Sequence, residues 1–526
     1  MRLIAFVNCK IYKKFQPLEV AEALVIVGDR IFYVGEKTKA INIARHNEGE
    51  IIDLNGSIVL PGFVDSHMHL SNYGLSLNSL DLRNVRSINE LKIKLKEFIN
   101  KHKELHWIIG RGWDQELFKE KRWPTKWDLD DVATDKYILL TRVCGHAAVL
   151  NSKALEYLLK ISKIPPNDPL LDRNDRSELT GIIKENLVWE LSNSIDFSLN
   201  ELLKFLMDGI KNTLKHGVTT VGFVSCPIKS FLALQTLHMI SNELPIRVRV
   251  YLEPHALPYL KALGILRSFG NEYLKLMGIK ILADGSLGAR TAWLTQPYAD
   301  DPKNSGTPLI SREELFKIAK EVLSNRLQLA IHAIGDRTLD MVIDVFSELN
   351  DYVEIHRFRI EHASIIRSNQ IEKLAKLGSI VTIQPHFIIT DYWVVNRLGT
   401  ERVSWIYPFK SMIRAGIKVG LSTDCPVEPI NPWETIYAAV TRGEYEGIEL
   451  VKYTSHEKLT VREALHYYTM GSAYALFEEN NIGSIEIGKY ADFIVVDRDP
   501  LSIDHKELRH IKNTMTVIGG RIVYKA

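Results

Sequence analysis

The 526-residue sequence has few cysteines and almost no net charge, and these shortages exclude several classes of protein. The four cysteines are widely spaced and contain no Cys-x-x-Cys pair, which argues against a disulfide framework and favours reduced thiols in a cytoplasm. The 66 basic and 64 acidic residues leave a net charge of +2, which gives no reason to expect nucleic acid or an anionic membrane as a partner. The cysteines are Cys9, Cys144, Cys226 and Cys425.

Long apolar runs and targeting signals are also missing from the sequence. No apolar run reaches about 18 residues, the length that predicts a membrane-spanning helix, so no membrane span is expected. The first eight residues carry no secretory cleavage pattern and favour a strand instead. These features agree with the predicted cytoplasmic location.

The sequence is rich in short apolar runs that alternate with helical stretches. Such runs, enriched in β-branched residues and closed by a polar residue and a turn, are typical of buried parallel strands. Eight of them with intervening helices predict an α/β fold, a (β/α)8 TIM barrel, which needs about 250 residues. We place the strands near 62–67, 218–225, 247–252, 277–283, 328–332, 357–362, 380–385 and 417–423.

Side chains that bind metals stand at the ends of several of these runs. His67 and His69 lie two residues apart, so in a strand their imidazoles project to the same side. The ends of barrel strands meet at the C-terminal face, where catalytic residues lie in this fold. Imidazoles and carboxylates gathered there would bind a divalent transition metal. The later strand ends carry His332, His362, His386 and Asp424.

The ordered set of motifs resembles the metal-dependent amidohydrolase superfamily. More narrowly it is similar to the YtcJ-like branch, the amidohydrolase 3 group, which includes N-substituted formamide deformylases. As an ordered set the motifs are highly specific, although none is specific alone, and together they cover nearly the whole chain. The matching stretches are 60–69, 280–288, 332–336, 360–363 and 422–426, with a branch-specific block at 145–152 and a superfamily segment at 482–492.

The resemblance implies a metal centre with six ligands. Two histidines of the first barrel strand and an aspartate after the eighth would hold one ion, two histidines of the fifth and sixth strands would hold a second, and a carbamylated lysine of the fourth would bridge them. In that order the ligands are His67, His69, Asp424, His332, His362 and Lys280.

Lys280 needs chemical modification to serve as a ligand, because an ammonium group has three donors and no acceptor. Reaction with CO2 would turn it into an anionic oxygen ligand. Two alternatives remain open from the residues alone: a single-metal site with unmodified Lys280, and a Lys280 paired with Asp284, four residues on.

The resemblance implies an enzyme that hydrolyses non-peptide carbon–nitrogen bonds in amides, N-substituted formamides or cyclic amides. A zinc-like ion lowers the pKa of bound water from about 15.7 to roughly 7, and the resulting hydroxide would attack the carbonyl carbon. Asp424 would take the proton of the water and pass it to the leaving nitrogen, which is general acid–base catalysis by one carboxylate. A plain ligand role for Asp424 is the alternative.

Four further residues are candidates for substrate contacts. His386 ends the seventh strand, and Asp284 opens a glycine-rich loop in which glycine permits close backbone approach. His146 and Trp113 lie in an insertion that in this branch contributes to the substrate pocket. A structural role is an open alternative for His386, His146 and Trp113.

The segments outside the barrel divide into two groups. Residues 1–58 and 483–526 contain short strands separated by glycine and aspartate turn signals, and the resemblance implies that they pair into a composite β-sandwich. Residues 59–482 then hold the barrel. An insertion at about 71–200 follows its first strand.

Two other functions stay open from the sequence. The same hydroxide could attack an ester, a lactone or a phosphoester, and some relatives keep the barrel as a non-catalytic scaffold. Faster turnover of O-esters than of matched amides would identify the first, and the lack of stoichiometric metal the second. The expected metal is zinc, with one or two ions per chain. The expected partner is a small-molecule substrate, and a homodimer is compatible with the sequence.

Overall fold

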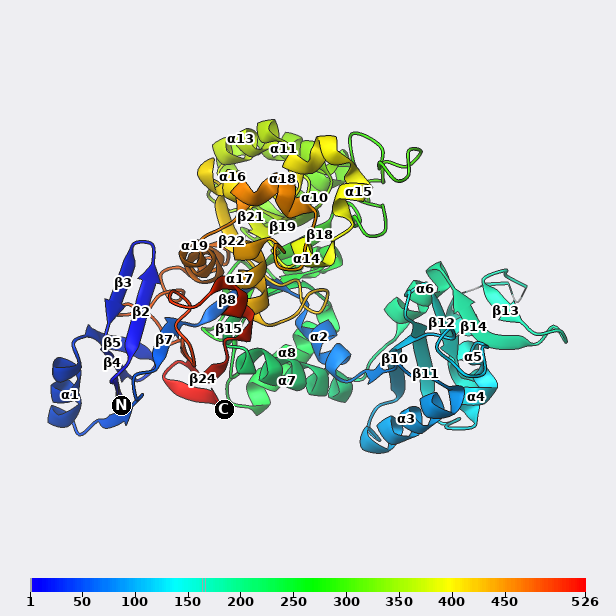
Figure 1. The fold of residues 1–526 in the computed structure, drawn as a ribbon, viewed down its shortest axis with the longest axis horizontal. Coiled ribbons are helices and arrows are strands. Elements are labelled where there is room, and N and C mark those ends of the chain that lie inside the picture. The colour runs from blue at the N-terminus through cyan, green and yellow to red at the C-terminus, as the bar shows by residue number, and fades with distance from the viewer. Residues whose placement is uncertain (1, 163, 166) are drawn as a thin grey trace. The chain divides into compact units, whose positions relative to one another are not determined.

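The computed structural model describes residues 2–162, 164–165 and 167–526, and the chain divides into two compact units (Figure 1). One unit joins Met1–Tyr73 to Asp208–Ala526, and the other is Gly74–Met207. No helix in the described part of the chain has the length and apolarity needed to cross a membrane.

Eight parallel strands of the first unit form the predicted barrel. Their hydrogen-bonded order is β22-β21-β20-β19-β18-β16-β15-β8. Two backbone hydrogen bonds join the ends of this series: the Asp424 amide donates to the His67 carbonyl at 2.9 Å, and the His69 amide to the Cys425 carbonyl at 2.8 Å. The strands are β8 (Phe63–Met68), β15 (Val218–Cys226), β16 (Arg247–Leu252), β18 (Leu274–Leu282), β19 (Gln328–Ala333), β20 (Arg359–His362), β21 (Ile380–Ile383) and β22 (Lys418–Leu421).

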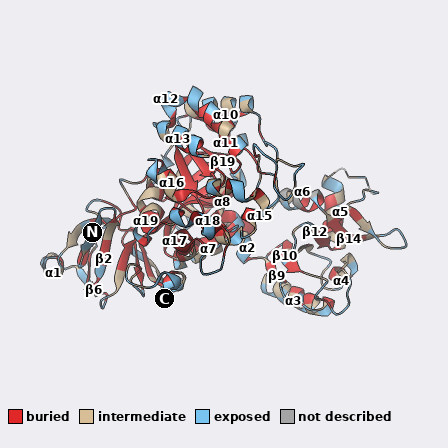
Figure 2. Ribbon diagram, turned by 45° about the horizontal axis from the view of Figure 1, so that its top comes forward, coloured by how far each residue is buried: buried red, intermediate tan, exposed pale blue. Residues whose placement is uncertain are grey.

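The barrel strands are buried on both faces, as parallel strands between side chains of the interior and a layer of helices must be. Every residue of β16 and β20 is buried, and Figure 2 colours the barrel strands red. Ser311 begins one helix by accepting a hydrogen bond from the Glu314 amide, and Asn431 begins another in the same way. The principal helices are α8 (Ile228–Ile240), α9 (Leu257–Ala262), α10 (Arg312–Ser324), α11 (Asp336–Glu348), α13 (Ser368–Lys376), α16 (Phe409–Arg414) and α17 (Pro432–Thr441).

Both ends of the chain contribute to two further sheets of this unit. A four-stranded sheet has the order β5-β4-β1-β6, and a six-stranded sheet has the order β25-β24-β23-β7-β2-β3. In the second sheet β7 pairs antiparallel with β23, so that Pro61 lies opposite Phe493. The strands are β1 (Leu3–Val7), β2 (Lys10–Phe15), β3 (Leu18–Ala21), β4 (Ala23–Val27), β5 (Arg30–Gly35), β6 (Glu50–Asp53), β7 (Ile58–Pro61), β23 (Phe493–Val496), β24 (Asn513–Ile518) and β25 (Arg521–Lys525).

The two terminal sheets share an apolar core that draws on both ends of the chain. Phe6 and Ile11 belong to the same buried cluster as Phe493 and Val517. The rings of Phe6 and Phe493 meet edge to face, with centroids 5.1 Å apart. Helix α1 (Lys37–His46) completes this part of the unit.

The second unit, Gly74–Met207, has its own mixed sheet and its own core. The sheet has the order β13-β14-β12-β11-β10-β9, and its core includes Trp107, Leu139, Leu150 and Leu158. Its elements are β9 (Leu80–Asp81), α3 (Ile88–Lys101), β10 (Trp107–Trp113), α4 (Lys126–Asp130), β11 (Tyr137–Arg142), β12 (Ala147–Leu150), α5 (Ser152–Ile161), β13 (Leu171–Arg173), β14 (Leu179–Lys184) and α6 (Asn186–Ser194). The unit occupies the stretch where the sequence predicts an insertion after the first barrel strand.

Candidate metal centre

The six residues predicted as metal ligands all lie at the C-terminal ends of barrel strands. His67 belongs to β8 and His69 follows it, Lys280 lies in β18, and His332 lies in β19. His362 is the last residue of β20, and Asp424 follows β22.

Three of these residues converge on one point. One potential ligand atom from each of His67, His362 and Asp424 lies within 4.8 Å of the others, and all three residues are buried. Asp424 Oδ1 lies 3.2 Å from His67 Nε2 and 3.1 Å from His69 Nε2. His332 adjoins the group, with its ring centroid 4.5 Å from that of His362.

The donor set fits a divalent cation because two of its buried atoms are unsatisfied. His67 Nε2 and Asp424 Oδ1 have no hydrogen-bond partner among the described residues. A buried polar atom without a partner costs about 1–3 kcal/mol, so such atoms are rare unless a ligand or water satisfies them. Imidazole nitrogen and carboxylate oxygen are the ligands that zinc and similar ions take in proteins.

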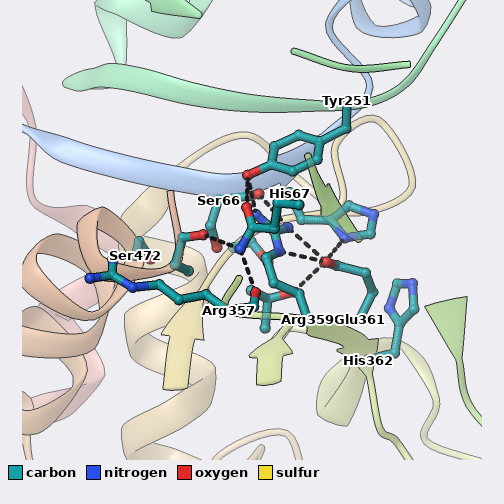
Figure 3. A network of polar contacts seen from close by, with 12 residues as sticks. Ser66, His67, Tyr251, Arg357, Arg359, Glu361, His362 and Ser472 are labelled. Carbon is teal, nitrogen blue, oxygen red and sulfur yellow. Dashed lines mark hydrogen bonds and ion pairs between the residues drawn. The ribbon is translucent and has the colours of Figure 1, made fainter. Parts of the chain in front are cut away.

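A buried carboxylate holds His67 in place (Figure 3). Glu361 Oε2 accepts a hydrogen bond from His67 Nδ1 at 2.5 Å, while Glu361 Oε1 pairs with the Arg359 guanidinium at 2.7 Å. Arg359 in turn donates to the Ser66 carbonyl and to the Tyr251 hydroxyl. Because the ionised Glu361 only accepts, His67 carries a proton on Nδ1, and its Nε2 faces Asp424.

The other two buried histidines are oriented by acceptors as well. His362 Nδ1 lies 2.7 Å from Gln384 Oε1, whose amide nitrogen donates to the Ser422 hydroxyl. His332 Nε2 lies 3.1 Å from the Gly285 carbonyl. A carbonyl oxygen accepts only, so the free lone pair is on Nε2 in His362 and on Nδ1 in His332.

Two candidate ligands have left-handed backbone conformations. His362 has a φ of 76° and Asp424 a φ of 62°, in a region that residues other than glycine rarely adopt. Such strained positions cluster at functional sites. At His362 the turn ends the strand alternation that would send neighbouring side chains to opposite faces, so Glu361 and His362 both reach His67.

The electrostatics keep two imidazoles neutral and Asp424 ionised. Burial and the neighbouring Lys280 lower the pKa of His332 to about 3, and burial and His332 hold the pKa of His362 well below its usual range. For Asp424, burial alone would raise the pKa, but the imidazoles of His67 and His69 outweigh burial and hold it well below the usual range. Neutral imidazoles and an ionised carboxylate are the protonation states that bind metal ions.

Lys280 is buried and stands apart from ion pairs. Burial lowers its pKa to about 8, although Glu361 and Asp424 act in the opposite direction. Within the described ranges it forms no ion pair with Asp284, so the geometry does not support the Lys280–Asp284 alternative.

Comparison with known proteins agrees with this arrangement. The model of the amidohydrolase family matches residues 50–524. The chain belongs to the amidohydrolase family.

Three relatives illustrate how far the similarity extends. A crystal structure described as an uncharacterized metal-dependent hydrolase from Pyrococcus horikoshii is 39% identical, with a TM-score of 0.86, 96% of this chain covered and 99% of that one. A Bacillus subtilis protein named as the amidohydrolase YtcJ is 31% identical, with 91% of each chain covered. The N-substituted formamide deformylase of Arthrobacter pascens is 26% identical, with 100% of this chain and 99% of that one covered.

In this amidohydrolase Asp284 joins the segments that follow β18 and β19 through hydrogen bonds. Its two carboxylate oxygens accept hydrogen bonds from the amides of Ile334 at 3.0 Å, Gly335 at 2.9 Å and Trp293 at 3.0 Å, and from the Thr338 hydroxyl. Burial nevertheless raises the pKa of Asp284 to about 6. With four donors already present, the geometry favours a structural role over the predicted substrate contact.

His386 is the predicted substrate residue that remains at the barrel mouth. It is buried at the start of α14 (Phe387–Thr390), and its Nδ1 pairs with Glu428. The Thr390 hydroxyl donates to the other oxygen of Glu428 at 2.6 Å. Nε2 of His386 lies 4.0 Å from Glu434 Oε2, and a substrate contact stays a prediction.

The two predicted substrate residues of the insertion have different surroundings. Trp113 is fully buried, and its indole donates to the Leu140 carbonyl at 2.7 Å, so its burial favours the packing alternative. His146 is exposed, with Nδ1 3.1 Å from Glu185 Oε2. The structure places both inside the second unit.

Three residues that orient the candidate ligands have no recognisable ligand pattern in the sequence. Glu361 and Gln384 contact His67 and His362, and Arg359 pairs with Glu361. One signal was present, because two charged residues, Arg359 and Glu361, lay just before His362 in a segment predicted to be a buried barrel strand.

Proposed function

We propose that this amidohydrolase cleaves a non-peptide carbon–nitrogen bond in a small amide, N-substituted formamide or cyclic amide. One or two divalent ions, zinc first, would be held by the four histidines His67, His69, His332 and His362 with Asp424, and by Lys280 as a carbamate in the two-ion form. The observation that carries the proposal is the convergence of three buried ligand residues with unsatisfied atoms on His67 and Asp424.

A divalent ion at this place supplies Lewis acidity and makes water a nucleophile near neutral pH. The chain's own part is to hold the histidine lone pairs in direction before the substrate arrives. Glu361 does this for His67, and Gln384 does it for His362.

Asp424 is the residue that we assign to proton transfer. Its carboxylate stays ionised because its pKa lies far below the usual range, and its Oδ1 has no donor among the described residues. It therefore accepts the proton of the attacking water and delivers it to the nitrogen as the carbon–nitrogen bond breaks, which is acid–base catalysis worth about 100- to 10,000-fold.

Lys280 is suited to carbamate formation. The reaction needs the neutral amine, whose lone pair attacks the carbon of CO2 while a proton leaves the nitrogen. A pKa lowered to about 8 makes the neutral amine accessible near physiological pH.

The substrate class rests on the relatives and the site together. A relative that covers nearly the whole chain is named an N-substituted formamide deformylase, which supports formamides as the first substrates to test. We also propose a cytoplasmic location, which the four cysteines without a disulfide support.

The test begins with metal content per chain, measured by elemental mass spectrometry on protein purified without chelators. About two transition-metal ions per chain would support the carbamate-bridged centre, and about one would favour a mononuclear enzyme with unmodified Lys280. No metal, and no uptake of added zinc or manganese, would overturn the hydrolase. A panel of formamides, amides and matched O-esters follows, and faster ester turnover would identify an esterase or lactonase.

A further inference from the structure

A large apolar surface lies on the outside of the barrel, along the helices that follow β15 and β16. It is formed by α8, by α9 and by the segment that leads through β17 (Phe269–Gly270). Surface helices usually present polar residues on their outer face, whereas α8 exposes four large apolar side chains there beside Lys229 and Gln235. The exposed side chains are Ile228, Leu232, Met239, Ile240, Tyr259, Leu263, Leu266 and Phe269; we call them the α8–β17 patch.

The parts of the patch lie on neighbouring elements. Ile228, Leu232 and Met239 follow one face of α8 at helical spacing, with the exposed Gln235 between the last two. The end of α8, which carries Met239 and Ile240, is joined to the β17 segment, because His238 Nε2 lies 2.9 Å from Asn271 Nδ2. Helices α8 and α9 follow the paired strands β15 and β16.

The patch has the size of a stable protein interface. Met239 is 79% exposed, Leu263 73% and Ile240 67%, and the eight side chains together expose on the order of 1,000 Å2. The largest apolar patch on a typical monomer measures roughly 300–600 Å2. A standard interface buries about 800 Å2 on each partner.

The composition of the patch favours protein over lipid as its occupant. Lys229 is the only Lys, Arg, Asp or Glu in 228–242, and 254–271 adds Lys261 and Arg267. The Arg267 guanidinium is engaged, stacked 3.8 Å from the centroid of the Phe477 ring. Interface cores are depleted of charge and enriched in aromatic residues and Met, whereas membrane-surface helices have a polar face rich in Lys and Arg.

We propose that the α8–β17 patch binds a second copy of this chain. A two-fold interface brings the same patch together from both subunits, so it must tolerate its own charge pattern. A patch with only two exposed lysines meets that condition, since its apolar centre contains no like charges to oppose.

The test is the mass of the full-length protein in solution, measured by light scattering and by sedimentation at micromolar concentration. We expect twice the 60.0 kDa chain mass for the unmodified protein. Met239→Glu with Leu263→Glu should weaken the dimer at least 100-fold and give the chain mass, because a charge would then be buried on each side. Both residues are exposed, so the fold should persist, which circular dichroism and thermal unfolding check.

A matched control is Ile355→Glu, an exposed apolar residue outside the patch at 69% exposure, which should leave the dimer intact. Three results would overturn the proposal: an unmodified protein that stays a monomer at 100 μM, a dimer that survives the double substitution, or a monomer that instead co-sediments with vesicles of phosphatidylglycerol and phosphatidylethanolamine. The last result would assign the patch to a membrane surface.

Discussion

Both ends of the barrel contain buried charged groups, but these are paired at the N-terminal end and partly unsatisfied at the C-terminal end. At the N-terminal end of the strands, Arg247 forms a two-pronged pair with Asp492, at 2.6 and 2.9 Å. Beside it Glu478 accepts from Arg249 at 2.8 Å and from Lys275 at 2.6 Å. At the C-terminal end, His67 Nε2 and Asp424 Oδ1 face each other without a hydrogen bond.

The difference distinguishes a cluster that stabilises the fold from one with buried atoms left for a ligand to satisfy. Paired buried charges satisfy each other, and removal of one partner leaves the other buried and uncompensated. Unsatisfied buried atoms cost stability unless something from outside completes them. In TIM barrels the C-terminal face carries the chemistry and the N-terminal face carries stability.

The largest expected effect is the loss of activity in Asp424→Asn. The amide cannot accept a proton and is a weaker ligand, so kcat should fall about 100- to 10,000-fold with the best formamide or amide substrate. The substitution also removes the attraction between this carboxylate and the imidazoles of His67 and His69, so thermal unfolding is measured in parallel to show that the variant stays folded. Turnover within threefold of the unmodified enzyme would remove Asp424 from the proton-transfer role.

The mirror-image experiment is Asp492→Ala at the other end of the barrel. Arg247 would remain buried without its carboxylate, and the free energy of unfolding should fall by about 3–5 kcal/mol, as urea denaturation would measure. Metal content should be unchanged in the protein that stays folded. Glu50→Ala, which breaks the exposed Arg2–Glu50 pair, is the control and should cost less than about 1 kcal/mol.

A smaller effect is expected from Glu361→Gln, a substitution at a residue that both packs in the barrel and positions a candidate metal ligand. The neutral amide keeps the shape beside His67 but no longer fixes its proton on Nδ1, so metal affinity should fall about 10- to 100-fold. Competition with a coloured chelator measures this without any turnover. Glu428→Gln, beside His386, should leave the affinity unchanged, and equal losses in both variants would contradict the positioning role of Glu361.

The smallest effect concerns the pH dependence of Lys280. A pKa of about 8, below the usual lysine range, means that the neutral amine forms as pH rises through 8. At constant dissolved CO2, the rate at which zinc restores activity to the metal-free enzyme should therefore rise about tenfold from pH 7 to pH 9. A CO2-depleted buffer is the control, and a rate that is flat with pH would speak against the carbamate.

The sequence alone predicted the barrel because its strands are short, apolar and closed by polar residues. All eight predicted strands are present, and β16 has the predicted bounds, Arg247–Leu252. The candidate ligands were visible for the same reason, since a histidine or aspartate at the end of a buried strand has few structural uses. His67, His362 and Asp424 lie together as their strand ends require.

The positioning residues could not be predicted, because they depend on backbone that leaves the strand pattern. Strict alternation would have turned Glu361 away from the face of His362, and only the left-handed conformation at His362 brings both to His67. For Trp113 the sequence indicated a substrate contact, and the structure shows a packed side chain. A tryptophan beside an aspartate in a glycine-containing segment suggested a pocket wall, whereas the residue fills the core of its own sheet.

The pairing of β7 with β23 has a consequence for how the chain is made. Ile58–Pro61 is synthesised roughly 430 residues before Phe493–Val496, an interval of about 20–90 s at 5–20 residues per second. Throughout that interval one edge of β7 has no strand beside it, and an open strand edge invites pairing with other chains. The nascent chain therefore carries an open strand edge until β23, the third-last of its strands, emerges.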